Sequence, residues 1–308
     1  MTWRDREIRK LDSLANNAAA SRRSKGAEYP VELYIVGYDE SKKGTERFLY
    51  IANRLMNKEG LFAIGLGTYP NTSEYRRMLR DREAPGRTLE EHEKILLDSL
   101  ASFSERDVEV SPVGIGWEGW TKELYRTREA KRSEAGKLIE AAKAERRFDA
   151  AVKKMAEGME IFEYALVLEE RHMANNLKHM GLFGNGMPSL VLATEYGNPQ
   201  TISASIGRNN PIMIVDSVDS GTSKRTFVMD IRKKIIEIKK GIAPKSSFEE
   251  SVARLLVFEM MEIDVMERNL TEYGKTMMRD WLNSLRKSGL DWTEKLFEDI
   301  RNRKIFED

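Results

Sequence analysis

The chain has no cysteine among its 308 residues, and only three histidines and eight prolines. The missing thiols exclude disulfides, thiolate zinc sites, iron–sulfur ligation and cysteine nucleophiles. No apolar run reaches the roughly 18–20 residues of a membrane span, and the first residues lack the apolar stretch of a secretory signal. We therefore expect a soluble protein, cytoplasmic or carried in a virion, with no membrane partner.

Charge is what the sequence has in excess. Lysine and arginine number 51 and aspartate and glutamate 50, so charged residues make up 33% of the chain and the net charge is only +1. Hydrophobic residues make up 41%, which is enough for a substantial core and excludes wholesale disorder. The length suits one large domain or two ordinary ones.

The near-zero net charge conceals blocks of alternating sign. Residues 1–25 carry seven basic and three acidic side chains, residues 122–154 eleven and six, and residues 222–245 eight and two. The remaining segments are acidic. The ordinary interpretation is charge compensation within one molecule. Two alternatives are nucleic-acid binding and contact with acidic patches on another copy. The neutral total favours the second of these, because free duplex binders are usually strongly basic.

The hydrophobic pattern divides the chain into three segments. Residues 1–28 are a basic arm, in which an amphipathic helix places Ile8, Leu11 and Leu14 on one stripe. Residues 29–245 are a core domain that opens as a βαβ pattern, with a strand at 31–37, a helix at 45–57 and a strand at 61–67. Residues 246–308 are a helical C-terminal region. Further strands are predicted at residues 108–115, 189–194, 201–206, 211–216, 226–231 and 235–238.

Most of the remaining segments have apolar residues at helical spacing. A helix is predicted at 89–104, where Thr88 and Glu91 form a capping box. Others are predicted over the charged residues 120–147 and near the C-terminus, at 247–285 and 292–303. Residues 150–180 fit either one long helix or strands. We therefore expect an α+β or mixed α/β fold with a central sheet of short strands, or, as the alternative, an open α/β sheet.

One short string of residues has the composition of a phosphate-binding loop. The apolar strand at 211–216 runs into Asp216, Asp219, Ser220, Gly221 and Thr222, and backbone amides and hydroxyls in such a turn can cradle a phosphate. The string resembles the ribose-phosphate loop of phosphoribosyltransferases, although Ser217 replaces the second of that family's adjacent acids. The resemblance implies an enzyme acting on a phosphorylated nucleotide or sugar. A hairpin turn would have the same composition.

The loop after the first strand stands where an open α/β sheet binds ligands. It reads Tyr38-Asp-Glu-Ser-Lys-Lys-Gly, and Gly44 at the start of a helix could hold an anion. The loop lacks a Gly-rich fingerprint, so its ordinary interpretation is a polar connection.

The histidine, methionine and tryptophan residues are interpreted as structural. His172 and His179 lie seven residues apart near Glu169, but metal-binding helices prefer a spacing of four. We therefore predict solvated or hydrogen-bonded histidines. Met260 and Met261 are expected in the core, and Trp117 in a buried or interface position. We assign no catalytic residue, no metal ligand and no cofactor.

The middle of the chain resembles the major capsid proteins of tailed phages. Residues 117–139 would be that family's extended charged loop, 152–164 its returning strands, 168–180 its helix and 181–190 its Gly-rich corner. The resemblance implies a capsid-like arrangement and a homo-oligomer. The βαβ pattern at 31–67 and the helical C-terminal region depart from the family.

These observations favour a self-assembling structural protein, such as a viral or phage coat component, rather than an enzyme. Its contacts with other subunits or with nucleic acid are assigned to basic side chains: Arg126, Arg128, Lys131, Arg132, Arg146, Arg147, Lys233 and Lys234. The first alternative is an α/β enzyme that binds a phosphorylated nucleotide or sugar. The second is an RNA-binding nucleoprotein.

Overall fold

A computed structural model of the chain describes residues 33–37, 42–81, 90–182, 188–194, 196–206, 212–215, 224–268, 284–285 and 288–302. The chain divides into two compact units, and each is built from two stretches of sequence. The first unit comprises residues 1–122 and 169–217, and the second residues 123–168 and 218–308. The predicted core segment, 29–245, therefore contributes to both units.

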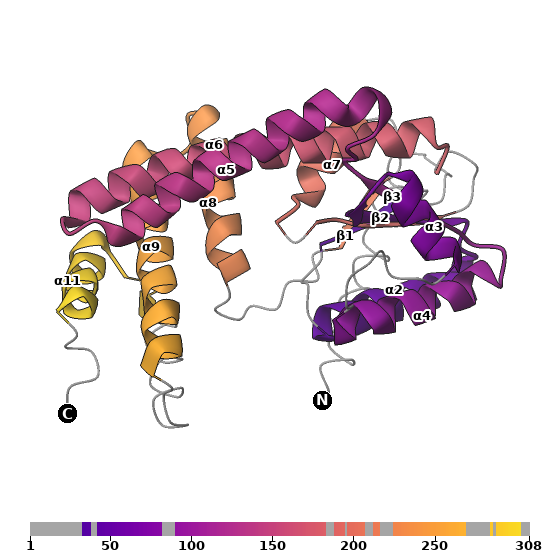
Figure 1. The fold of residues 1–308 in the computed structure, drawn as a ribbon, viewed down its shortest axis with the longest axis horizontal. Coiled ribbons are helices and arrows are strands. Elements are labelled where there is room, and N and C mark those ends of the chain that lie inside the picture. Colours follow the sequence, from indigo (N-terminus) through magenta and orange to yellow (C-terminus); the bar gives the residue numbers. More distant parts are fainter. Residues whose placement is uncertain are drawn as a thin grey trace, which may run out of the picture. The chain divides into compact units, whose positions relative to one another are not determined.

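The first unit holds an open parallel β-sheet (Figure 1). Its order is β3-β2-β4-β1-β5, and every neighbouring pair is parallel. The mixed α/β prediction is confirmed, and the sheet has the open form that we gave as the alternative. The strands are β1 (Leu33–Val36), β2 (Ala63–Pro70), β3 (Glu109–Gly114), β4 (Ser189–Leu192) and β5 (Ile212–Val215).

Helices cover both faces of this sheet (Figure 1). Helices α2 (Lys42–Glu59) and α4 (Glu91–Ser104) pack on one face, where they meet Tyr34 and Val36 of β1. The C-terminal part of α6 (Phe148–His179) and α7 (Pro199–Ile206) pack on the other face, against Leu33 and Ile35. Successive strand side chains point to opposite faces, so a strand covered on both sides has no polar position. This is why β1 reads as an unbroken apolar run.

A short helix, α3 (Ser73–Asp81), follows β2 and was not predicted. Its start is held by Glu118, whose carboxylate accepts hydrogen bonds from the backbone N–H and the hydroxyl of Ser73, both at 2.9 Å. These two bonds lower the pKa of Glu118, the backbone bond most. The capping residue is 45 positions away in the chain, so no local sequence pattern predicts the start of this helix.

The second unit is helical. It contains α5 (Lys122–Ala144), most of α6, and the helices α8 (Lys224–Lys239), α9 (Lys245–Arg268) and α11 (Leu290–Arg301). The rings of Phe227 and Phe258 join α8 to α9 with centroids 5.0 Å apart. A buried ion pair joins α8 to α6: Arg232 is 1% exposed, and its Nε lies 2.5 Å from Oε2 of Glu163.

Three of the predicted strands are wrong. Residues 201–206 lie in α7, because Asn198 caps that helix through a bond from Gln200 N–H to its Oδ1 at 2.9 Å. Residues 226–231 and 235–238 lie in α8. The apolar residues of α8 alternate over a few positions, but over the whole helix Phe227, Ile231 and Ile235 form one buried face at a spacing of four.

Of the ambiguous residues 150–180, all but the last belong to one helix, α6. The predicted returning strands at 152–164 are therefore wrong, and most of the predicted extended loop at 117–139 is helix α5. Buried Ala151, Met155 and Met159 recur every four residues along α6, which is helical spacing. The capping box of α4 is also corrected: it is formed by Glu90 and Glu93. Thr88 and residues 269–283, the end of a predicted helix, lie outside the described residues.

Candidate phosphate site at the carboxyl edge of the sheet

The connections that follow the neighbouring strands β1 and β4 run in opposite directions across the sheet. From β1 the chain passes through α2 to β2, which lies beyond β4. From β4 it passes through α7 to β5, which lies beyond β1. The ends of β1 and β4 are paired, Val36 with Leu192. Such a switch point, at the carboxyl ends of parallel strands, is where open α/β sheets bind ligands.

The connection from β1 leads into the start of a long helix. Gly37 follows the strand, and the 18-residue helix α2 begins at Lys42, with Gly44 and Thr45 buried in its first turn. The first N–H groups of a helix have no partner within the helix, and its dipole adds partial positive charge there. A helix start in this place therefore favours an anion.

An ion pair fixes the start of α2 relative to α4. Nζ of Lys42 donates to Oε1 of Glu91 at 2.8 Å. The hydrogen bond raises the pKa of Lys42 and lowers the pKa of Glu91. Both groups are exposed, so we expect the pair to orient the helix more than to stabilise the fold.

The loop after β4 buries a hydroxyl group. Thr194 is only 8% exposed, and its Oγ1 has no hydrogen-bond partner in the part of the chain that the structure describes. The loop is held from both sides: Gly197 N–H donates to Thr194 O at 2.8 Å, and buried Glu170 accepts a bond from Asn198 N–H. A buried polar group without a partner costs about 1–3 kcal/mol. A ligand at the end of β4 would remove that cost.

The predicted phosphate string follows β5 at the same edge. Asp216, Asp219, Ser220, Gly221 and Thr222 lie outside the described residues. The strand before them ends at Val215, which pairs with Val36 at the end of β1. The string and the loop after Gly37 therefore follow two strands whose ends are paired with each other. The sequence presented them as two separate and weak signals.

A buried polar pair on α6 lies against the end of β3. Nδ2 of Asn176 donates to Val113 O at 3.0 Å and lies 3.1 Å from Nε2 of His172, which is 2% exposed. The prediction of a solvated or hydrogen-bonded histidine is confirmed for His172. Asn176 was not predicted, although its spacing of four from His172 places both on one helix face. Among the described residues no group of three His, Asp or Glu could hold a metal.

Most of the basic side chains predicted as contacts have partners within the chain. At least five of the eight form ion pairs with nearby carboxylates: Arg126 with Glu123, Arg128 with Glu129, Lys131 with Glu134, and both Lys233 and Lys234 with Glu237. Arg132 is half-buried, and Arg146 and Arg147 are exposed. Their contacts with other subunits or nucleic acid stay predictions.

The remaining packing predictions concern methionine and tryptophan. Met260 and Met261 are 6% and 2% exposed, which confirms them as core residues. Trp117 is half-buried, with its ring 5.9 Å from that of Tyr75 in an edge arrangement. None of the helices in the described ranges is long and apolar enough to cross a membrane.

Comparison with known proteins adds no family or fold relative. No protein-family model, no curated protein and no solved structure matches the chain. What the protein does is therefore inferred from its own residues.

Proposed function

We propose that the protein binds the phosphate group of a phosphorylated nucleotide or sugar at the carboxyl edge of its sheet, around the ends of β1 and β4. One observation carries this proposal. The strand order brings the ends of β1, β4 and β5 to one edge, and three features follow these ends along the chain: the start of α2, the hydroxyl of Thr194 and the string from Asp216 to Thr222. Each is weak alone, and together they make a site of the kind that parallel sheets offer.

The three features have complementary roles. The N–H groups at the start of α2 and Lys43 would hold the phosphate. The hydroxyl of Thr194 would donate to the ligand. Asp216 and Asp219 would accept hydrogen bonds from ribose hydroxyls, as the resemblance to phosphoribosyltransferases implies.

The loop between β1 and α2 also has part of the spacing of a nucleotide-binding loop. Lys43 follows Gly37 by six positions, as the lysine follows the first glycine in G-x-x-x-x-G-K-[ST]. Lys42 replaces the second glycine, and the hydroxyl residue, Thr45, comes one position late. The partial match supports phosphate binding and does not assign a reaction.

Self-assembly as a coat-like protein is our second hypothesis. The observation that favours it is a set of exposed large apolar side chains in the second unit: Tyr164, Ile242, Leu290 and Trp292. Because the segments compared with the capsid loop and strands are helical, this hypothesis depends on such surfaces and not on the capsid-like arrangement.

A thermal-shift screen tests the phosphate proposal. We would add ATP, GTP, phosphoribosyl pyrophosphate or inorganic phosphate at millimolar concentration to the full chain. A ligand at 100 times its Kd adds about 2.7 kcal/mol, which raises the Tm of a unit of this size by roughly 5–10 °C. Lys43→Ala should abolish the rise. The matched control, Lys122→Ala at the start of α5, should preserve it. The absence of any shift would contradict the proposal.

A further inference from the structure

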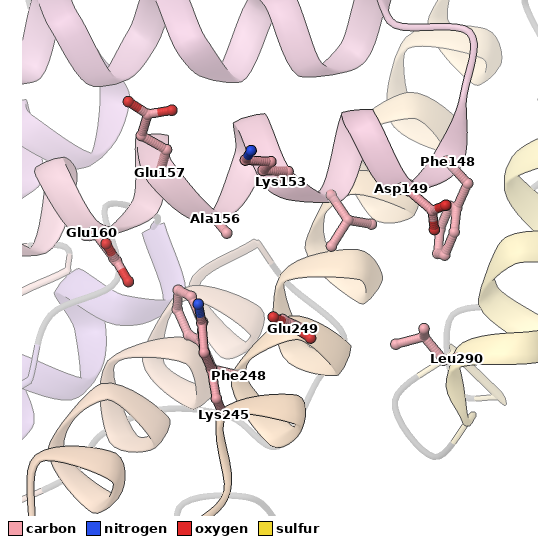
Figure 2. Close-up of a pocket in the computed structure, with 11 residues that line it drawn as sticks. Phe148, Asp149, Lys153, Ala156, Glu157, Glu160, Lys245, Phe248, Glu249 and Leu290 are labelled. Carbon is pink, nitrogen blue, oxygen red and sulfur yellow. The ribbon is translucent and has the colours of Figure 1, made fainter.

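A groove of about 470 Å³ lies within the second unit, between α6 and the starts of α9 and α11 (Figure 2). Its floor is apolar, because Phe148, Val152 and Phe248 are each less than a tenth exposed. Leu290, at the start of α11, adds a more exposed apolar side chain at one end. The volume is that of a site for a side chain cluster or a small molecule.

Exposed apolar side chains gather on the elements that form this groove. The described residues expose four large ones, and all four lie in α6, in the turn before α9, or at the start of α11. Tyr164 is one helical turn beyond the groove residue Glu160, and Ile242 precedes Lys245 by three positions. The exposed fractions are 52% for Tyr164, 70% for Ile242, 37% for Leu290 and 39% for Trp292. These side chains add exposed apolar area on and beside the elements that line the groove.

The charged side chains along the groove are mostly acidic. Four carboxylates face two lysines, and none of the six forms an ion pair with another described residue. On α5, by contrast, Arg126 and Lys131 are paired with carboxylates of their own helix. With four carboxylates and two lysines, the groove therefore offers a net negative charge around an apolar floor. The six are Asp149, Glu157, Glu160, Glu249, Lys153 and Lys245.

We propose that this groove binds the basic N-terminal segment, residues 3–25, of a second copy of the chain. That segment carries seven basic and three acidic side chains, and its sequence predicts a helix with Ile8, Leu11 and Leu14 on one stripe. The apolar stripe matches the floor, and the basic residues match the acidic rim. An amphipathic helix in an apolar groove is a common mode of recognition.

The consequence is a head-to-tail contact. Each copy offers one segment and one groove, and these are different surfaces. Such a contact either closes, as a reciprocal exchange of segments between two copies or as a larger ring, or grows into a filament. This inference is independent of the phosphate site, which lies in the other unit.

The first test measures binding of a labelled synthetic peptide of residues 3–25 to the full chain by fluorescence anisotropy. Glu160→Lys and Leu290→Asp should each weaken binding by about tenfold or more, which corresponds to about 1.4 kcal/mol. The matched control is Glu298→Lys, an exposed acid of α11 outside the groove, and it should leave binding unchanged. A peptide with Arg9→Glu should bind the Glu160→Lys chain better than it binds the unmodified chain.

The second test measures native mass by light scattering in low and high salt. The full chain should form an oligomer in low salt, and Leu11→Asp should reduce it to a monomer without change in circular dichroism. The proposal is overturned by a chain that is monomeric in low salt, even if it binds the peptide, and by a chain that does not bind the peptide. It is also overturned if a scrambled peptide of the same composition binds as well, or if the control substitution weakens binding as much as Glu160→Lys. None of these outcomes affects the phosphate-dependent thermal shift.

Discussion

Replacing Thr194 by valine should separate a ligand-binding hydroxyl from a structural one. Valine keeps the shape of threonine and removes only the hydroxyl. In the ligand-free protein the Thr194 hydroxyl is buried and has no partner among the described residues, so its removal ends a desolvation cost of about 1–3 kcal/mol. We expect Thr194→Val to raise the free energy of unfolding, by about 1 kcal/mol at the lower end of that range.

Thr121 provides the matched comparison in the same unit. It is 7% exposed, and its Oγ1 lies 2.7 Å from both Gly116 O and Glu118 O. Thr121→Val removes these bonds and leaves the buried carbonyl of Gly116 without this donor, so it should lower the free energy of unfolding by about 1–2 kcal/mol. The two substitutions are chemically identical and should have opposite signs.

Urea unfolding, followed by circular dichroism, measures both variants without ligand, and thermal shift measures them with it. A hydrogen bond to a charged ligand is worth about 1.5–3 kcal/mol, so Thr194→Val should weaken phosphate-ligand binding by roughly ten- to a hundredfold. Thr121→Val should leave the affinity unchanged. If Thr194→Val destabilises the ligand-free chain as much as Thr121→Val does, the hydroxyl has a partner within the molecule and the reasoning is refuted.

Three further predictions concern the rest of the molecule. Arg232→Met leaves the buried carboxylate of Glu163 alone and should cost about 3–5 kcal/mol in urea unfolding, whereas the double variant with Glu163→Leu should recover most of it; an equal loss in both would contradict a pairing role. Ser73→Ala should raise the pKa of Glu118 towards its ordinary value in an NMR titration, because a donor to the carboxylate is lost. Since the folded-state pKa of Glu118 is lowered, its small contribution to stability is present above the ordinary pKa and disappears as the pH falls through the lowered one. RNA binding, if the basic blocks mediate it, should weaken steeply with salt; a salt-independent affinity would count against the nucleoprotein alternative.

The sequence by itself determined those helices and strands whose hydrophobic pattern lies within a few neighbouring residues. β1, α2 and β2 were predicted within a few residues, because an apolar run and a following amphipathic stretch are properties of neighbouring residues. The failures have a local cause too. In residues 201–206 and 226–238 a few alternating apolar positions look like strands, and only the cap at Asn198 and the buried face of α8 decide for helix.

Only the tertiary structure decided the strand order and hence the candidate site. Leu33 pairs with Ser189 on one side and with Ile212 on the other, and nothing near Leu33 in the chain specifies either partner. Parallel pairing joins residues far apart through crossover connections, so its order follows from how the helices pack on the two faces and not from a local pattern. For the same reason, only the folded chain brought the ends of β1, β4 and β5 to one edge of the sheet. The features of the candidate site follow these strand ends in the sequence.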